Sequence, residues 1–417
     1  MTKPPSVWSA HPGSSPLIYE LAAALPALGY DAQFLTGFYY DPQGFLAKLV
    51  KALPGSLSAK LEREFRRRTH PAIDPKGTVT HPFWEFAFVA AMRIAPTRRG
   101  WATAIMDQRN ARFDEATASM IRRDRPDLVI GYDTSSLRTL RSARAVGSVA
   151  VLNQVIGHLA VGRRTLAEEA ARNPAFADSL NFHAPDWLVE QCTLEALAAD
   201  HVFAPSPYVR DTLLEVGVPA DRIALLPYGV RVERFKPPEK PREDGIFRVL
   251  YVGQLSQRKG LSYLLDAWAK LKLPNAELVL VGGIVGSGDG FRPYAGQFRH
   301  VRNVPHHEVA DLYRTADIMA YPSLHEGSAL AILEAMASGL PIVTTPNSGS
   351  LVQDGVDGFI TQMRDVDALA ARIEELYRNP EKRQEMGEAA CANAQSYSWD
   401  HYRVRLKGFL DGMLATR

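Results

Sequence analysis

The sequence predicts an α/β protein with two Rossmann-like domains, each built on a doubly wound parallel sheet, and a cleft between them. Three observations support this fold class. Short apolar runs alternate with helical patterns along the chain, which is typical of parallel sheets covered by helices. A segment rich in proline and charge, KPPEKPREDG at 236–245, separates two series of such alternations. The length of 417 residues suits two or three domains of ordinary size.

The first series occupies the first half of the chain. Its runs DLVIGY and SVAVLN are almost entirely apolar, which indicates strands buried on both faces of a parallel sheet. We assign residues 1–225 to this N-terminal domain. Strands are expected at 5–10, 32–36, 127–132, 148–153, 201–206 and 223–230, with helices at 17–28, 185–200 and 207–216. Helical patterns also precede the strands at 127–132 and 148–153.

The second series restarts after the proline-rich segment. We assign residues 226–398 to a C-terminal domain and 399–417 to a terminal helix. Strands are expected at 247–253, 276–283, 317–323 and 340–345. Helices are expected at 260–271, 328–338, 366–378, 381–396 and 400–414.

A basic amphipathic segment at 45–70 interrupts the first series. It is expected to be helical, with Phe45, Leu49 and Leu53 on one face. Seven bases and two acids between residues 48 and 68 give this segment a local charge of +5. Such segments lie on anionic membrane surfaces or bind anionic ligands, and the alternative is a solvated face above the domain core. We therefore keep an anionic membrane surface as a candidate partner.

Composition excludes several classes of protein. Hydrophobic residues make up 46% of the chain and charged residues 23%, which excludes disorder over most of its length. The net charge of +2 is too balanced for a dedicated nucleic-acid-binding protein. The sequence begins with no secretory signal, and no apolar run is long enough to span a membrane. We therefore expect a cytoplasmic location, or a peripheral one at the inner face of the membrane.

Motifs of several enzyme classes are absent. The dinucleotide fingerprint G-x-G-x-x-G fails after strand 276–283, because Phe291 stands where its third glycine belongs. The chain has no Walker A, H-E-x-x-H or G-x-S-x-G motif. Its one D-x-D pattern, at 365–367, is typical of a helix start. No metal site is therefore expected.

The loop and helix after strand 317–323 carry the most chemical information. Ser328 is a favoured N-cap residue, and exposed N–H groups at a helix N-terminus bind phosphate. Glu334 lies about 9 Å further along the helix, roughly the span from a diphosphate to the ribose of a nucleotide. Its carboxylate can accept two hydrogen bonds from a diol. Glu326 lies at the diphosphate end, where a sugar would sit.

A second loop, after strand 247–253, carries two adjacent bases. Arg258 and Lys259 precede Gly260, which begins a helix. Two bases at the carboxyl edge of a parallel sheet suit a pyrophosphate group and would stabilise charge on a leaving phosphate.

Together these motifs resemble those of the family 4 retaining glycosyltransferases (glycosyl transferases group 1), which have the GT-B fold. Gly253, Lys259 and Gly260 match the family's G-x5-K-G loop, and Glu326 and Glu334 match its Glu-x7-Glu motif. Supporting segments are LLPYGVRVERF, LEAMASGLPIV, DGVDGFI and the late Ser-Trp pair. The resemblance is strong over 200–410 and only architectural over 1–200.

The resemblance implies roles for the matching residues. Arg258 and Lys259 would bind the donor diphosphate, Glu334 the ribose, and Glu326 would lie near the donor sugar. A histidine after a strand of the N-terminal domain approaches that sugar in the family, and His158 is its candidate here. The candidate catalytic residues are thus Glu326, His158, Arg258 and Lys259. Further donor-binding positions are Gly253, Gly327, Ser328, the backbone N–H groups of Ala329 and Leu330, and Gly13 in the first loop.

Two departures from the family pattern affect this interpretation. Gln254 stands where many members have arginine, so Arg258 and Lys259 would carry more of the charge. The first loop also lacks the double glycine of many members.

The implied function is transfer of a sugar from a UDP- or GDP-sugar to an acceptor hydroxyl, with retention of the anomeric configuration. The N-terminal domain would bind the acceptor, a glycan or lipid-linked intermediate of polysaccharide synthesis, and the terminal helix would cross back to that domain. No cofactor or divalent metal is expected, because the helix dipole and the two bases would act at the diphosphate. Two alternatives stay open: a nucleotide-sugar 2-epimerase of the same architecture, and a non-catalytic nucleotide-sugar-binding protein.

Overall fold

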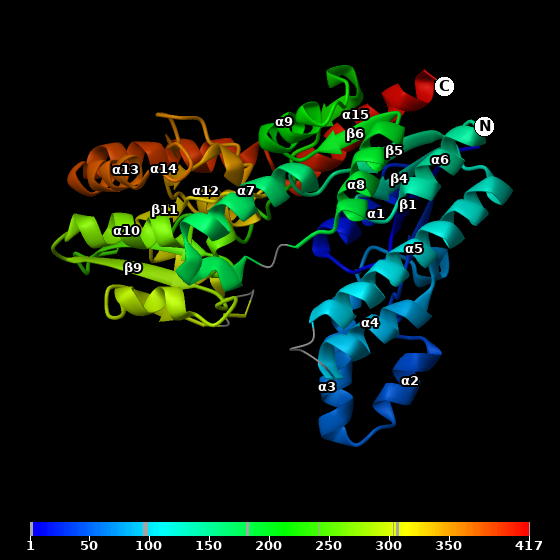
Figure 1. Cartoon of the computed structure of the whole chain (residues 1–417), viewed down its shortest axis with the longest axis horizontal. Coiled ribbons are helices and arrows are strands. Elements are labelled where there is room, and N and C mark those ends of the chain that lie inside the picture. The colour runs from blue at the N-terminus through cyan, green and yellow to red at the C-terminus, as the bar shows by residue number, and fades with distance from the viewer. Residues whose placement is uncertain are drawn as a thin grey trace.

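The computed structural model describes the chain except residues 1–2, 95–98, 181–182, 241, 303, 306–307 and 417. Two parallel sheets, each flanked by helices, come from consecutive parts of the chain (Figure 1). The prediction of two doubly wound, Rossmann-like domains is therefore confirmed.

The first sheet has seven strands in the order β3-β2-β1-β4-β5-β6-β7. Its strands are β1 (Ser6–His11), β2 (Asp31–Thr36), β3 (Thr78–Thr80), β4 (Leu128–Tyr132), β5 (Val149–Asn153), β6 (His201–Ala204) and β7 (Ile223–Leu225). The expected strand 223–230 ends early, at Leu225, because Pro227 has no N–H to donate and Val230 instead pairs with Ser398. The strand order reverses between β1 and β4, which marks the ligand-binding edge of this domain.

The helices of the first domain cover this sheet and extend beyond it. They are α1 (Pro16–Ala27), α2 (Phe45–Lys51), α3 (Gly55–Phe65), α4 (Pro82–Ile94), α5 (Arg99–Asp124), α6 (Leu137–Ala145), α7 (Leu159–Arg172), α8 (Asp186–Ala198) and α9 (Pro207–Glu215). Helices α4 and α7 are not among the elements that the sequence predicts. None of the described helices of the chain is long and apolar enough to cross a membrane.

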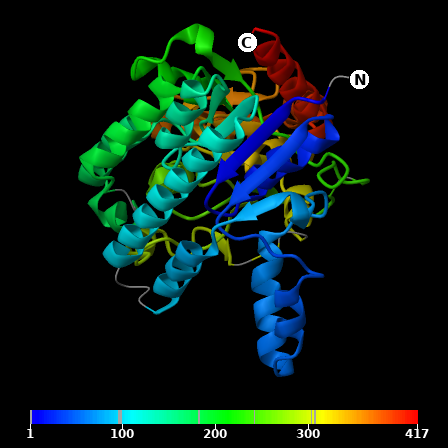
Figure 2. The same ribbon diagram turned by 90° about the vertical axis from the view of Figure 1, so that its right-hand side faces the viewer.

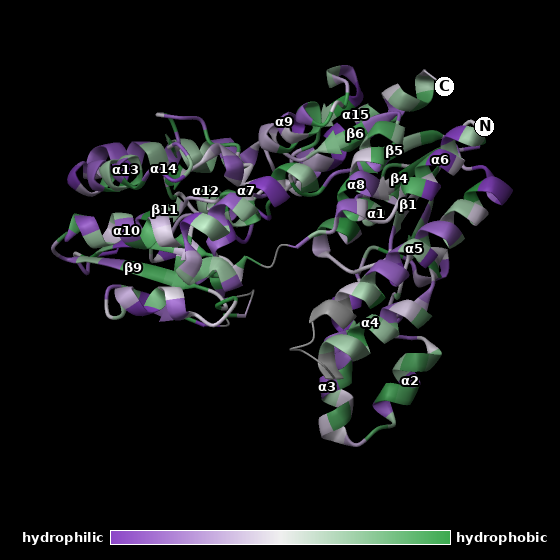
Figure 3. Ribbon diagram, in the orientation of Figure 1, coloured by the Kyte–Doolittle hydropathy of each residue, from purple (hydrophilic) through white to green (hydrophobic). Residues whose placement is uncertain are grey.

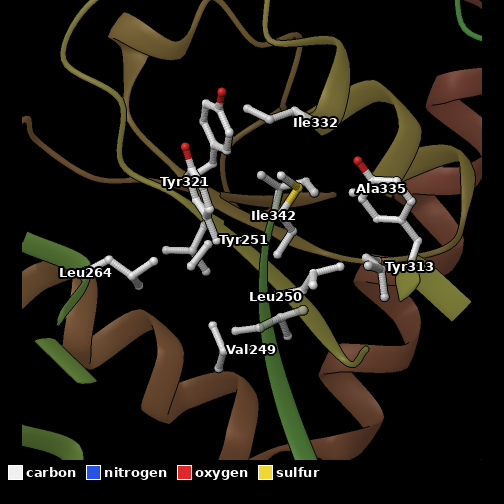
Figure 4. Packing of buried hydrophobic residues seen from close by; sticks show 14 of the residues in the cluster. Val249, Leu250, Tyr251, Leu264, Tyr313, Tyr321, Ile332, Ala335 and Ile342 are labelled. Atoms are coloured by element: carbon white, nitrogen blue, oxygen red, sulfur yellow. The ribbon is translucent and has the colours of Figure 1, made fainter. Parts of the chain in front are cut away.

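The second sheet has six strands in the order β10-β9-β8-β11-β12-β13. They are β8 (Phe247–Val252), β9 (Ala276–Val281), β10 (Arg299–Val301), β11 (Ile318–Tyr321), β12 (Ile342–Thr344) and β13 (Gly358–Ile360). The helices around them are α10 (Leu261–Leu271), α11 (Val309–Arg314), α12 (Leu330–Ala337), α13 (Val366–Arg378) and α14 (Pro380–Gln395). Figure 4 shows the core of this domain, where Val249 and Leu250 of β8 pack near Ile342 of β12.

Two helices tie the domains together. The last helix, α15 (Trp399–Ala415), returns to the first domain and buries Tyr402, Leu406 and Leu410 in one cluster with Leu21 of α1. The first strand, β1, and the last helix, α15, therefore lie in the same domain (Figure 1). Helix α7 leans the other way, toward the second domain, where its buried Glu169 accepts hydrogen bonds from side chains of that domain.

The chain leaves the first sheet at Leu225, enters the second at Phe247 and starts α15 at Trp399. Helix α7 is hard to predict from local sequence, because part of its apolar face packs on the other domain: Leu166 clusters with Leu324 of that domain as well as with Leu180 of the first.

Candidate active site

The two motif loops meet at one edge of the second sheet. One loop follows β8 and the other follows β11, and these strands pair in parallel where the strand order reverses. Ligands of open α/β sheets bind outside the carboxyl ends of strands at such a point. The close packing of the loops requires glycine at position 260, because Gly260 has φ +70° and an added Cβ would lie 2.0 Å from the carbonyl oxygen of Pro322. Gly253 follows the last residue of β8, and its N–H donates to the carbonyl of Val281 at 2.9 Å.

The structure brings the predicted charges into one cluster. Arg258 Nη1 donates to Glu326 Oε1 at 2.6 Å, and Lys259 Nζ contacts the same oxygen. Lys259 Nζ also donates to Tyr321 Oη at 2.7 Å, and Figure 4 shows Tyr321 beside Tyr251, with which it stacks. The side chains of Lys259 and Glu326 are 9% and 11% exposed. Burial and the charge of Arg258 hold the pKa of Lys259 well below its usual range.

When Lys259 is protonated, this cluster has an excess of positive charge, because one carboxylate balances two cations. An excess cation in a poorly solvated site favours binding of an anion. The donor diphosphate proposed from the sequence would supply that anion and would compete with Glu326 for the same two bases.

The start of helix α12 differs from the prediction. The helix begins at Leu330 with Ala329 as its N-cap residue, and no side chain caps it, so the expected capping role of Ser328 is wrong. The preceding backbone is held by tertiary contacts instead. The carbonyl of Gly327 accepts from Ser206 Oγ at 2.6 Å, and the N–H of Ala329 donates to the carbonyl of Ser348 at 3.2 Å. Of the two backbone donors predicted for the phosphate, Ala329 is thus engaged within the protein.

Glu334 lies in a cavity between the domains. The cavity has a volume of about 410 Å³, and its lining residues are Pro16, Leu17, Glu20, Gly229, Val230, Arg231, Arg234, Phe235, Leu330, Glu334 and Trp399. Glu334 Oε2 accepts a hydrogen bond from Tyr313 Oη at 2.9 Å. Burial raises the pKa of Glu334 to about 7, although Tyr313 and Arg234 oppose this effect. The carboxyl group is therefore poised between its neutral and ionised forms at neutral pH.

His158, the histidine predicted to approach the donor sugar, is a buried helix-capping residue. His158 is fully buried at the N-cap of α7, where its Nδ1 accepts from the N–H of Ala160 at 3.2 Å. Burial also lowers the pKa of His158. The ring has no exposed surface toward a sugar in this arrangement.

A histidine that the sequence analysis missed, His325, lies directly at the site. It precedes Glu326, and its Nδ1 is 2.7 Å from Tyr208 Oη of the first domain. The ring fills a notch lined by Gly157 and Gly162, where added Cβ atoms would lie 2.7 and 2.5 Å from ring atoms. Nothing in the local sequence indicates this contact, because the notch belongs to the other domain.

The loop after β5 also contacts the Glu326 loop through its backbone. The N–H of Gly157 donates to the carbonyl of Glu326 at 3.0 Å. An added Cβ at Gly327 would lie 1.8 Å from the carbonyl oxygen of Val155, so position 327 requires glycine for this close approach. The first domain thus packs directly against the loop that carries Glu326, one of the residues assigned to the donor.

We predict that Gly162→Ala weakens the packing of His325 against the first domain. The new methyl group would overlap the ring of His325, and overpacking of this kind costs about 1–3 kcal/mol. Gly408→Ala is a matched control, because Gly408 lies exposed on α15 with no atom within 4 Å of an added Cβ. Urea unfolding should show a lower free energy of unfolding for G162A and an unchanged or higher value for G408A. Equal stability of the two variants would contradict the prediction.

The first loop lies at the corresponding edge of the first sheet. Gly13 follows β1, and its N–H donates to His11 Nδ1 at 2.9 Å. The ring of His11 packs edge-on against Tyr132, the last residue of β4, at 5.1 Å between ring centroids. Burial lowers the pKa of His11 to about 4. Gly13 therefore lies at the point where the strand order of the first sheet reverses.

Two family profiles match the chain. The profile "Glycosyl transferase 4-like domain" covers residues 13–229, and "Glycosyl transferases group 1" covers residues 232–392. The chain belongs to the glycosyl transferase 4-like family, whose profile covers more than half of it, and its second domain matches the group 1 profile. This membership agrees with the resemblance found from the motifs, and the two profiles divide the chain between its two sheets.

Curated relatives of this glycosyltransferase include enzymes named D-inositol 3-phosphate glycosyltransferase. The protein from Paenarthrobacter aurescens is 28% identical over 242 residues, which are 51% of this chain and 59% of the relative. The protein from Corynebacterium urealyticum is 31% identical over 211 residues, 44% of this chain and 50% of the relative. The chain thus spans about half the length of the curated relatives it matches.

Solved structures support the GT-B fold of the glycosyltransferase. Sucrose-phosphate synthase from Thermosynechococcus elongatus has a TM-score of 0.66 at 19% identity, over 99% of this chain and 100% of that one. Anabaena HepE in complex with UDP and glucose has a TM-score of 0.60 at 18% identity, over 98% and 99% of the two chains. At these identities the likeness shows the fold alone, and it confirms the predicted two-domain architecture.

Proposed function

We propose that the protein transfers a sugar from a nucleotide-diphosphate sugar to an acceptor hydroxyl, with retention of the anomeric configuration. The observation that carries this proposal is the cluster of Arg258, Lys259 and Glu326 at the reversal point of the second sheet, directly opposite the first domain. The two bases would bind the diphosphate without a divalent metal, helped by the N-terminus of α12. Glu334, on the same helix, would bind the ribose.

We propose UDP as the first donor nucleotide to test and GDP as the second. HepE, which shares this fold, binds UDP and UDP-glucose according to its structures. The proposed setting is synthesis of lipid-linked glycans or polysaccharides.

A thermal-shift screen in EDTA tests this proposal. UDP-, GDP- and ADP-sugars should be compared, with NAD as the control. A ligand at 100 times its Kd adds about 2.7 kcal/mol to stability, which shifts the melting temperature visibly. Stabilisation by one nucleotide family in EDTA would support the proposal, and a response to NAD alone would overturn it.

Two product measurements separate the alternatives. A 2-epimerase would convert the nucleotide sugar without any acceptor, whereas a transferase needs the acceptor hydroxyl. A non-catalytic binding protein would show the thermal shift and no turnover with either.

We also propose that the hairpin of α2 and α3 contacts an anionic membrane surface. The hairpin extends from the body of the first domain (Figure 2), and α2 is largely hydrophobic (Figure 3). Phe45 is 76% exposed and Leu49 50%. Exposed apolar side chains beside lysines are typical of helices that lie in a membrane interface. Arg68 is not available for this role, because it contacts the buried carboxylate of Glu85.

Removal of two lysines from α2 should weaken membrane binding. Each basic residue near an anionic surface contributes about 1 kcal/mol, so Lys48→Gln with Lys51→Gln should lower partition onto phosphatidylserine vesicles about 30-fold. The matched control replaces Lys270 and Lys407, which lie on α10 and α15. Co-sedimentation measures both variants. Equal vesicle binding by the two double variants would contradict the membrane proposal.

A further inference from the structure

A second buried charge cluster lies in the first domain, separate from the residues assigned to the donor. Arg68 Nη1 contacts Glu85 Oε1, and Arg109 Nη1 donates to Glu85 Oε2 at 2.8 Å. The side chain of Glu85 is 2% exposed, and those of Arg68 and Arg109 are 14% and 10% exposed. Arg68 comes from the 3-10 turn Arg66–Arg68 that follows α3, Glu85 from α4 and Arg109 from α5, so only the fold brings them together.

The cluster holds one positive charge in excess. Within the described residues, Glu85 is the one carboxylate that forms an ion pair with Arg109. The other donors of Arg109, Nε and Nη2, reach only the neutral amide oxygen of Asn110, at 3.1 and 3.0 Å. Buried charges are costly unless paired, so a net cation here favours binding of an anion from outside.

Arg109 also lines a cavity of about 300 Å³. The cavity lies where β1, β2 and β3 end, since Pro12, Gly37 and His81 line it directly after those strands. This is the ligand-binding edge of an α/β sheet. Arg109 connects it to the first loop, because an added Cβ at Gly13 would lie 3.7 Å from Arg109 Nη1.

The remaining walls suit a charged sugar. Trp84 and Phe113 supply apolar surface. Arg112 adds an exposed guanidinium group, which forms a surface ion pair with Glu115 at 3.4 Å that an incoming anion would have to compete with. The buried Nε2 of His81 has no hydrogen-bond partner among the described residues. Small-molecule sites combine apolar walls with a few convergent polar groups in this way.

We propose that this cavity binds an oxyanion of the acceptor, a phosphate or a carboxylate, through Arg109 and Arg112. Guanidinium groups bind both oxyanions through paired hydrogen bonds. The inference rests on the proposed function and deepens it, because it assigns the acceptor to a chemical class: a molecule that carries a phosphate or a carboxylate.

Calorimetric titration of the full chain tests the assignment. The protein is first saturated with UDP, so that Arg258 and Lys259 are occupied, and then titrated with glucose 6-phosphate, glucuronate or neutral glucose. We expect a charged sugar to bind and glucose not to bind. The stronger of the two charged probes identifies the oxyanion as phosphate or carboxylate.

Three variants locate the binding site. Arg109→Gln should weaken binding of the charged sugar about 10- to 100-fold, because it removes a charge-assisted hydrogen bond. Arg112→Gln should also weaken binding of the charged sugar. Because Arg112 is exposed, this variant should stay folded even if R109Q unfolds. Arg123→Gln, at an exposed arginine of α5, is the matched control and should leave the affinity unchanged.

The inference is overturned if neither charged sugar binds, or if folded R109Q or R112Q binds it as R123Q does. The result that overturns this inference differs from the result that would overturn the proposed function. Absence of binding by UDP, GDP and ADP alike would overturn the proposed function, and the sugar titrations would then be repeated without a nucleotide on Arg258→Gln.

Discussion

Replacement of Glu326 by glutamine is expected to raise the affinity for UDP while nearly abolishing sugar transfer. In the structure the carboxylate of Glu326 pairs with both Arg258 and Lys259, the bases assigned to the diphosphate. Donor binding must break these pairs, so Glu326 acts as an internal competitor. Removal of its charge makes both bases more available to the nucleotide.

Whereas its affinity for UDP should rise, the kcat of E326Q should fall. Once the diphosphate displaces it, Glu326 becomes available to the donor sugar, beside the bases that would stabilise the leaving phosphate. Loss of an electrostatic group at a reacting centre costs about 10²- to 10³-fold in kcat. Titration of UDP and steady-state kinetics on E326Q measure the two effects. A variant that keeps wild-type kcat would contradict the assignment of Glu326, and weaker UDP binding would contradict the competition.

Donor affinity is expected to rise with pH because of Glu334. Burial raises the pKa of this carboxyl to about 7, so the ionised fraction grows from about one tenth at pH 6 to about nine tenths at pH 8. The ionised form is the better acceptor for two ribose hydroxyls. UDP-glucose, whose phosphates do not titrate in this range, should bind up to about tenfold more tightly at pH 8. In Glu334→Gln this gain in affinity should disappear. If E334Q kept the pH dependence of the wild type, the assignment of Glu334 to the ribose would be contradicted.

The raised pKa of Glu334 also predicts how the stability of the protein changes with pH. The folded pKa lies above the unfolded value near 4.5, so the folded state binds the proton more tightly. The stabilisation from this proton is present below pH 4.5 and is lost as pH rises toward 7. The free energy of unfolding of the wild type should therefore fall relative to E334Q across that window. Urea unfolding at pH 5 and pH 7.5 measures the difference, with Glu388→Gln, at an exposed position on α14, as the control.

Local sequence was sufficient for much of the fold. The strands β4, β5, β8 and β9 are short apolar runs bounded by turns, and helices α13, α14 and α15 lie within about one residue of their predicted ends. These elements are determined by periodicity and burial that repeat over many neighbouring residues. The prediction failed where one tertiary contact decides the outcome, as at the end of β7 and at the cap of α12.

The sequence by itself indicated a glycosyltransferase and identified the two motifs proposed for the donor. Arg258 and Lys259 lie in one strand–helix loop, and Glu326 and Glu334 lie in another, so their spacing along the chain is enough to identify them. The tertiary structure alone decided which residues meet. Strand order brings Glu326 to the two bases, domain packing places His325 against Tyr208, and three separate helical segments supply the cluster around Glu85. These contacts join residues far apart in the chain, and no local pattern specifies such distances.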